Sequence, residues 1–382
     1  MKNRRFPPLI LAISMMMSLA LAACGTSNNQ ENSAGNVSQE PTEVVSVSLS
    51  PEESASSAEA YRTVTNIDGT EITVPLNVER IGCLFGPSYE KVVVLGAEDK
   101  VVFDGDFHIY SWPWSNMIYQ YVNDVPGIEN AHSEPNIEDL VTYSPDVVFN
   151  FPNPTTTETM EAAGMCVVPS ASTGAYDDIV KMLAVYAEVI GGGAIANSDR
   201  YAEYFYDMTD MIAERVADVP EDERPTVYFA NQEILKCSNK TDLIERCGGI
   251  AVASDITGNS VEIDKEQLIE WNPDYIFVDH AGSSGNATAE EVIAEMLADP
   301  VYNSISAVAN DSIIIVPTGV FFWDSGVQQP LLMLLLAQTM YPDLFSDMNM
   351  KDTLIGFYSE FYYYDLTGEQ ADLILAHMDP IV

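Results

Sequence analysis

The chain is 382 residues long, which is long for one hydrophobic core and sufficient for two. Its 58 acidic residues far outnumber its 16 lysines and arginines, so the formal net charge is −42. This excess argues against partners made of nucleic acid or anionic lipid. It also disfavours a binding site built from arginine and lysine for a strongly anionic ligand, although a local basic patch could exist within the total charge.

The N-terminus is typical of a secretion signal. Basic residues precede an apolar run that ends Leu21-Ala22-Ala23-Cys24. This ending resembles the bacterial lipobox, in which the cysteine is lipidated and becomes the first residue of the mature protein. We therefore expect residues 1–23 to be a lipoprotein signal peptide and Cys24 to anchor the protein to the outer face of the cell membrane. A plain signal peptide followed by a coincidental cysteine is the alternative.

Residues 24–58 consist largely of small and polar side chains. Such a composition cannot bury a core, so we interpret the segment as a disordered tether. No later segment has the ~20 apolar residues that a bilayer-spanning helix needs.

The folded part begins near residue 59 with elements typical of an α/β lobe. Residues 63–74 alternate between strand-forming and polar types around Asp68-Gly69, which predicts a β-hairpin. Strands are predicted at 79–85 and 101–103, with a helix between them. Residues 104–126 then predict a long aromatic loop, and loops of more than about 15 residues are usually functional.

Two distant segments, residues 137–149 and 265–277, share one pattern. With Glu138 aligned to Glu266, both read Glu-x-Leu-aliphatic-x-aromatic-polar-Pro-Asp-x-aliphatic-Phe. Leucine and the aromatic residue lie on one helical face, proline ends the helix, and the apolar residues after it are typical of a buried parallel strand. A helix-like stretch and a second strand follow each copy. We therefore predict a duplicated architecture, although this order is common in α/β proteins.

The residues between the two copies predict a connector. Residues 177–190 form an amphipathic pattern that ends at a run of three glycines, and 194–217 contain neither glycine nor proline. We expect one long helix, 194–218, to join an N-terminal lobe (59–193) to a C-terminal lobe (219–382). An ordinary helix of one lobe would give the same pattern. The predicted fold is α/β, with two similar lobes built on central, mostly parallel sheets.

Four cysteines follow Cys24, and their spacing matches no zinc pattern. Cys83 and Cys166 lie in or beside apolar strands and are expected to be buried thiols. Cys237 and Cys247 close a short loop and could form a disulfide in an exported protein.

Taken in order, these features resemble the substrate-binding lipoproteins of bacterial ABC importers for iron complexes, haem and cobalamin. No single feature is specific, and the resemblance depends on their order from about residue 61 onward. The residues that carry it are Asp68-Gly69, Glu79-Arg80-Ile81, Leu95-Gly96-Ala97, both Pro-Asp strand entries, Trp323-x-Ser325-Gly326 and Tyr341-Pro342-Asp343.

The resemblance implies a monomeric, non-enzymatic protein without a cofactor. Its cargo would be an iron chelate such as a ferric siderophore, haem or a corrinoid, held between the lobes and delivered to an ABC permease dimer with its ATPase. In this family one exposed glutamate on each lobe docks onto arginines of the permease. Glu138 and Glu266 match those positions, and a two-fold partner requires the same charge twice. Alternatively, both are first-turn acids favoured by the helix dipole.

The ligand site is expected where loops leave the carboxyl ends of the strands, between the lobes. The candidate residues are Phe85, Ser88, His108, Tyr110, Trp112, Trp114, Asn150, Phe151, Asn231, His280, Phe321, Phe322, Trp323 and Ser325. Aromatic residues dominate and basic residues are missing. This set disfavours a catecholate or hydroxycarboxylate siderophore and suits a flat macrocycle, or a neutral or cationic chelate. His108 or His280 could coordinate the metal centre.

Three other functions stay open. A secreted hydrolase is disfavoured because Gly-x-Ser-x-Gly and His-Glu-x-x-His are both absent. A receptor for a free metal ion could use His108, His132 and His280. A sensor domain or adhesin without a transport role is the third.

Overall fold

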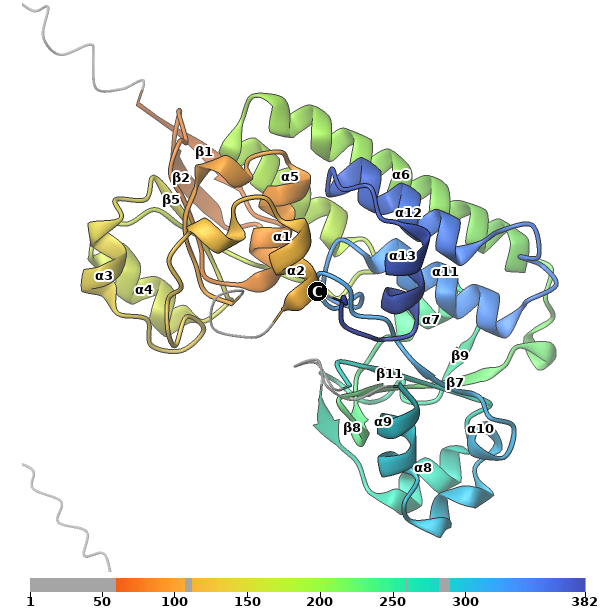
Figure 1. Ribbon diagram of the computed structural model, residues 1–382. Coiled ribbons are helices and arrows are strands. Elements are labelled where there is room, and N and C mark those ends of the chain that lie inside the picture. The colour runs from red at the N-terminus through yellow and green to blue at the C-terminus, as the bar shows by residue number, and fades with distance from the viewer. Residues whose placement is uncertain (1–59, 107–111, 259, 282–288, 382) are drawn as a thin grey trace, which may run out of the picture. The chain divides into compact units, whose positions relative to one another are not determined.

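The computed structural model describes residues 60–106, 112–258, 260–281 and 289–381 (Figure 1). The predicted signal peptide, the tether, Cys24, His108 and Tyr110 lie outside these ranges. Within them, no helix combines the length and the apolar character that a bilayer crossing requires.

The first lobe contains the predicted hairpin and a parallel sheet. Strands β1 (Tyr61–Thr65) and β2 (Glu71–Pro75) pair antiparallel, with Gly69 at a φ of +86° in the turn. The sheet has the order β4-β3-β5-β6 and is parallel throughout. Its strands are β3 (Ile81–Cys83), β4 (Val101–Asp104), β5 (Val147–Asn150) and β6 (Val167–Pro169). The helices are α1 (Gly86–Val94), α2 (Pro113–Ile118), α3 (Ile137–Thr142), α4 (Pro154–Ala162) and α5 (Asp178–Ile190).

The second lobe contains a mostly parallel sheet with the order β10-β8-β7-β11-β12, and β9 also pairs with β7. Strands β8 and β10 are antiparallel to their neighbours, and the other pairs are parallel. The strands are β7 (Thr226–Asn231), β8 (Glu233–Cys237), β9 (Ile250–Ala251), β10 (Val261–Glu262), β11 (Tyr275–Asp279) and β12 (Ile313–Ile315). The helices are α7 (Thr241–Arg246), α8 (Lys265–Trp271), α9 (Ala289–Met296) and α10 (Ser306–Ala309).

The predicted duplication is confirmed. The first copy folds as α3 followed by β5, and the second as α8 followed by β11. Strand β5 lies between β3 and β6, and β11 lies in the same way between β7 and β12. The two copies therefore occupy equivalent central positions in their sheets.

The repeated Pro-Asp pair has the same function in both copies. The residue before each proline, Ser144 or Asn272, ends its helix with a positive φ of 47° or 42°. Asp146 Oδ2 accepts hydrogen bonds from the backbone N–H groups of Glu79 (2.8 Å) and Arg80 (2.9 Å), just before β3. Asp274 Oδ2 accepts from Thr226 N (2.8 Å) and Thr226 Oγ1 (2.7 Å) at the start of β7. Asp146 thus joins β5 to its neighbour β3 in the sheet, and Asp274 joins β11 to its neighbour β7.

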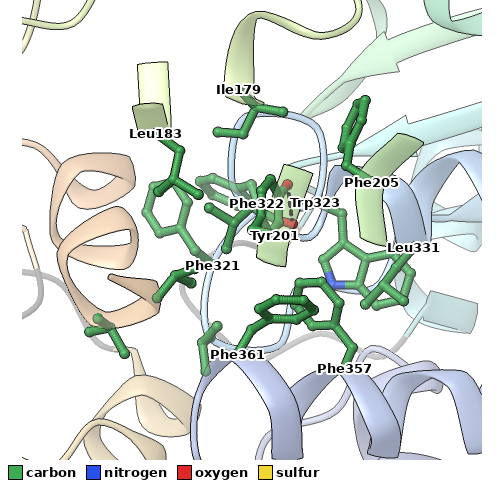
Figure 2. Packing of buried hydrophobic residues seen from close by; sticks show 14 of the residues in the cluster. Ile179, Leu183, Tyr201, Phe205, Phe321, Phe322, Trp323, Leu331, Phe357 and Phe361 are labelled. Carbon is green, nitrogen blue, oxygen red and sulfur yellow. Dashed lines mark hydrogen bonds between the residues drawn. The ribbon is translucent and has the colours of Figure 1, made fainter. Parts of the chain in front are cut away.

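One long helix, α6 (Gly193–Val216), connects the lobes, as predicted for 194–218. It packs against α5 of the first lobe, α7 of the second, and α11 (Gln329–Met340). Helices α12 (Met350–Phe361) and α13 (Gly368–Leu375) follow. The last three helices share one core with α1, α5 and α6 and with β7, α7 and β11 of the second lobe. Figure 2 shows Tyr201 and Phe205 of α6 in this shared core with Trp323, Phe357 and Phe361.

Three expectations differ from the structure, and they concern the loop 104–126, the disulfide and the burial of Cys166. The predicted loop 104–126 contains α2, and Trp112, Trp114 and Tyr119 from this region are buried in the shared core. The possible Cys237–Cys247 disulfide is absent, because both thiols are free. Cys247 packs in the shared core, with its Sγ 3.4 Å from the carbonyl oxygen of Met333, whereas Cys237 packs in the core on the other face of the second sheet. Cys83 is buried as expected, while Cys166 is half-buried.

We expect removal of either repeated aspartate to destabilise the protein. Asp146→Ala and Asp274→Ala each remove the acceptor of two hydrogen bonds at a strand start, so each should lower the free energy of unfolding by about 0.5–1.5 kcal/mol. Urea denaturation monitored by circular dichroism measures the change. The matched control Asp255→Ala, which removes an exposed aspartate, should change stability by less than about 0.5 kcal/mol. Equal stability of all three variants would contradict the assigned role of the repeat.

Candidate functional site

A cavity of about 490 Å³ is lined by residues from both lobes, and its size is typical of a small-molecule site. The first lobe contributes the loops that leave the carboxyl ends of β3, β5 and β6. The second lobe contributes residues 239–243, which lead into α7, and the segment after β12. Of the predicted ligand residues, Phe85, Phe151 and Ser325 line this cavity. The cavity lies beyond the strand ends, where we predict the ligand site, and its use by a ligand stays a prediction.

Most of the other predicted ligand residues lie in the interior. The Ser88 hydroxyl is fully buried 2.8 Å from the Tyr186 hydroxyl, and Trp114 Nε1 donates to the carbonyl of Met378 at 2.9 Å. Trp323 is fully buried among the side chains shown in Figure 2. Trp112 packs on both Phe321 and Phe322, at ring distances of 4.8 and 5.0 Å. The aromatic residues expected to surround a ligand therefore form much of the shared core.

The two asparagines at strand ends are also buried. Asn150 ends β5, and its Nδ2 donates to Thr157 Oγ1 at 3.2 Å. Asn231 ends β7. Neither is among the residues that line the cavity in the described part of the chain.

Helix α1 positions the first charged group of the cavity. The helix begins at Gly86-Pro87, and proline is well suited to a first helical turn because its φ is already helical. Glycine is required at residue 86 because a Cβ atom there would lie 2.5 Å from the ring of Phe321. The Gly86 N–H donates to Asp106 Oδ2, which fixes the start of the helix. One turn later the helix carries Glu90, whose side chain is buried in the interior, and Lys91, whose side chain lines the cavity.

Lys91 is a cation that sequence reasoning missed. It lines the cavity but is only 3% exposed, and its Nζ donates to the carbonyl of Pro87 at 3.1 Å. Burial lowers the pKa of Lys91 to about 8, although Glu90 opposes this change. None of the ion pairs in the described residues includes Lys91. The negative net charge of the chain argued against a cation in the site, but a net charge does not indicate which single side chain faces a cavity.

Lys240 is the second cation of the cavity wall, and it comes from the opposite lobe. Its Nζ lies 3.0 Å from Asp324 Oδ2. The other two carboxylates of the wall already have donors within the protein. Asp242 Oδ2 accepts from Tyr176 N (3.0 Å), and Asp178 accepts from Ser172, Thr173 and Gly174. Burial opposes ionisation of Asp178, but the hydrogen bonds from Thr173 and Ser172 lower its pKa overall.

Asp324 also joins a cluster at the carboxyl end of β11. His280 Nε2 lies 2.8 Å from Asp324 Oδ1, and Asp279 Oδ1 accepts from His280 N at 2.7 Å. His280 has a φ of +59°, a conformation that costs a non-glycine residue about 1–3 kcal/mol. Its ring stacks on Phe322, with the ring centroids 3.4 Å apart. Burial and the neighbouring Asp324 raise the pKa of Asp279 to about 8.

The histidines proposed as a metal cage do not form one group in the described residues. His132 Nε2 lies 2.9 Å from Asp106 Oδ1, and its ring stacks on Phe151 at the edge of the cavity. His280 pairs instead with Asp324. The described residues that could hold a metal ion together are Asp279, His280 and Asp324. The sequence alone could not indicate this group, because Asp324 is far from Asp279 and His280 along the chain.

The two predicted docking glutamates occupy equivalent exposed positions. Glu138 is in the first turn of α3, where Asn136 caps the helix. Glu266 is in the first turn of α8, which is capped by Asp264. Their docking role stays a prediction.

Two α/β lobes joined by a long helix, with a ligand-sized cavity between them, define a solute-binding protein. The chain belongs to the periplasmic binding protein family, whose model matches residues 81–318. It is similar to the molybdate-binding protein MolA of Haemophilus influenzae, with 24% identity over 337 residues, which cover 80% of this chain and 92% of MolA. MolA is the cognate periplasmic binding protein of a Haemophilus influenzae ABC transporter, and the family is extracytoplasmic.

Solved structures share the fold. A periplasmic solute-binding protein from Veillonella parvula has a TM-score of 0.66 and 22% identity, over 82% of this chain and 97% of its own. CeuE of Helicobacter pylori, crystallised with nickel and histidine, has a TM-score of 0.66 and 20% identity, over 82% of this chain and 99% of its own.

Glu90 makes a pH-dependent contribution to stability. It is fully buried, and its carboxylate accepts from Val327 N (2.9 Å) and from the Tyr362 hydroxyl. Burial raises the pKa of Glu90 from 4.5 to about 7, even though these hydrogen bonds oppose the shift. A raised carboxyl pKa means that the folded protein holds the proton more tightly than the unfolded chain. The stabilisation is therefore complete below pH 4.5 and is lost as the pH rises to about 7.

We expect Glu90→Gln to remove this pH dependence. Relative to the parent protein, the variant should gain stability between pH 4.5 and pH 7, by a total on the order of 3 kcal/mol. Urea denaturation across this range measures the difference. Glu221→Gln, which changes an exposed glutamate, is the control and should follow the parent curve. A constant difference between Glu90→Gln and the parent across this range would contradict the assignment.

Proposed function

We propose that the protein captures a metal-containing solute with anionic oxygen groups and delivers it to an ABC permease. The observation that carries this proposal is the buried Lys91 ammonium in the cavity wall, which has a carbonyl but no carboxylate as its partner. The neighbouring Glu90 and the ring of Tyr186, whose centroid lies 5.7 Å from Nζ, partly stabilise this ammonium, yet burial still lowers the pKa of Lys91 to about 8. A ligand that supplies negative oxygen atoms would therefore be stabilised there.

The opposite wall supports an anionic cargo. Lys240 lies on the second lobe, so cations from both lobes line the same cavity. The acidic residues Asp178, Asp242 and Asp324 are already hydrogen-bonded or paired within the protein. A ligand therefore meets at Lys91 an ammonium that forms no ion pair with these carboxylates of the cavity wall.

Similarity to a molybdate-binding protein supports an anionic, metal-containing cargo, since molybdate is a metal oxyanion. The cargo class extends to anionic metal chelates, including the catecholate and hydroxycarboxylate siderophores that the composition had disfavoured. Haem or a corrinoid would find Phe85, Phe151 and Tyr176 as aromatic surface. These three rings offer a smaller aromatic surface than the larger set of aromatic residues predicted from the sequence.

Delivery would depend on the lipid anchor and the two glutamates. A lipidated Cys24 would hold the protein at the outer face of the membrane, near the permease. Glu138 and Glu266 would present one charge on each lobe to the two permease subunits. Their equivalent places in the duplicated elements support this role.

Thermal unfolding in the presence of candidate cargoes tests the binding role. The panel is molybdate, ferric citrate, a ferric catecholate, haem, cobalamin and an uncharged ferric hydroxamate. A cargo at 100 times its dissociation constant should add about 2.7 kcal/mol of stability. Lys91→Met should weaken the binding of an anionic cargo about 10- to 100-fold, because a hydrogen bond to a charged group contributes about 1.5–3 kcal/mol.

The control for this experiment is Lys351→Met, which removes a lysine outside the cavity and should leave binding unchanged. Without cargo, Lys91→Met should stabilise the protein, since it removes a buried charge. A shift with the uncharged hydroxamate alone would contradict the anionic cargo.

Transport assays in cells test the docking role. Glu138→Ala combined with Glu266→Ala should abolish uptake of the cargo, while the purified double variant binds it normally. Glu270→Ala, which changes an exposed acid at the other end of α8, should transport like the parent. Full uptake by the double variant would remove the docking role and leave the binding role intact.

A further inference from the structure

We propose that Asp279, His280 and Asp324 bind a resident divalent transition-metal ion at the edge of the cavity. All three residues belong to the second lobe, so the site does not depend on the cargo or on the first lobe. The ion would be a fixed part of the protein, in addition to the transported solute.

The first support is the geometry of the ligand atoms. One ligand atom from each of the three side chains lies within 4.8 Å of the others. His280 Nε2 and Asp324 Oδ1 are 2.8 Å apart. Two ligands of a tetrahedral metal with bonds of 2.0–2.2 Å lie about 3.3–3.6 Å apart. A small separation of this pair, with a rotation of Asp279, would complete a three-ligand site.

The second support is an independent one, the unsatisfied oxygen of Asp279. Its side chain is fully buried, and Oδ1 accepts a hydrogen bond from His280 N. The other oxygen, Oδ2, is buried and has no hydrogen-bond partner. Buried carboxylate oxygens are rarely left in this state, because each carries the full cost of desolvation. A cation shared with Asp324 would satisfy this oxygen.

The surrounding structure brings the three ligand residues together before an ion binds, so that only small side-chain adjustments remain. Asp279 is the last residue of β11, where the sheet fixes its backbone. Stacking on Phe322 sets the plane of the His280 ring. Lys240 holds the second oxygen of Asp324, and Asp324 itself lines the cavity. An ion could therefore enter from the cavity.

The donor set indicates the kind of ion. Imidazole nitrogen with carboxylate oxygen suits manganese, iron, cobalt, nickel or zinc, whereas magnesium and calcium favour oxygen alone. Three protein ligands leave at least one coordination position open. The ion would hold Asp324 in place, and with it the exposed Ser325 of the cavity wall.

Equilibrium dialysis of the chelator-treated protein against zinc, manganese or cobalt chloride tests the proposal. We expect one ion per chain, and cobalt should give visible absorption bands that change when a ligand is replaced. Asp279→Asn keeps the shape of the side chain but weakens coordination, so it should lower the affinity at least tenfold. His280→Gln should do the same and should also alter the cobalt spectrum.

The chain offers a matched control in His132, which pairs with Asp106 at 2.9 Å beside the same cavity but belongs to no three-ligand group of the described residues. His132→Gln should retain the ion. The alternative is that Asp279 simply carries a proton. In that case the parent binds no ion, or Asp279→Asn binds it as tightly as the parent, and either result would overturn the proposal. Circular dichroism of each variant establishes that it is folded.

Discussion

A carboxylate that joins two neighbouring strands organises each lobe. Asp146 ties β5 to the residues that enter β3, and Asp274 ties β11 to the start of β7. Since these strands are parallel, fixing their starts also fixes which loops emerge together at their carboxyl ends. Those loops supply much of the cavity wall. The hydrogen bonds at the amino ends of the strands therefore help to fix which loops line the cavity at their carboxyl ends.

The shared core then relates the lobes to each other. Glu90 on α1 of the first lobe accepts a hydrogen bond from Val327, just before α11. The adjacent residue, Lys91, lines the cavity. One helix thus satisfies a buried carboxylate on its core side and presents an ammonium without a carboxylate partner on its cavity side. Substitution of Glu90 changes internal hydrogen bonds, whereas substitution of Lys91 changes both the burial of a charge and the charge that a ligand meets.

The sequence predicted the architecture better than the site. The repeat specified β5 and β11 because hydrophobic periodicity and a Pro-Asp turn are local signals. The same signals do not distinguish an aromatic residue in a core from one in a cleft, so Trp112, Trp114 and Trp323 were assigned to the ligand. Nor could spacing show that Cys237 and Cys247 lie on opposite faces of the second sheet. Both errors concern which side of an element a residue faces, and tertiary packing decides this.

The net charge of −42 and a cavity for an anion are physically compatible. Exposed charges separated by more than about 8 Å are largely screened at physiological ionic strength. A ligand in the cavity would therefore respond mainly to the groups in direct contact with it. Lys91 is almost fully buried, so water screens its charge much less than it screens the surface carboxylates. The surface charge acts mainly on the association rate, which it would lower for an anion. A nearby cation such as Lys91 acts mainly on the dissociation rate of the bound anion.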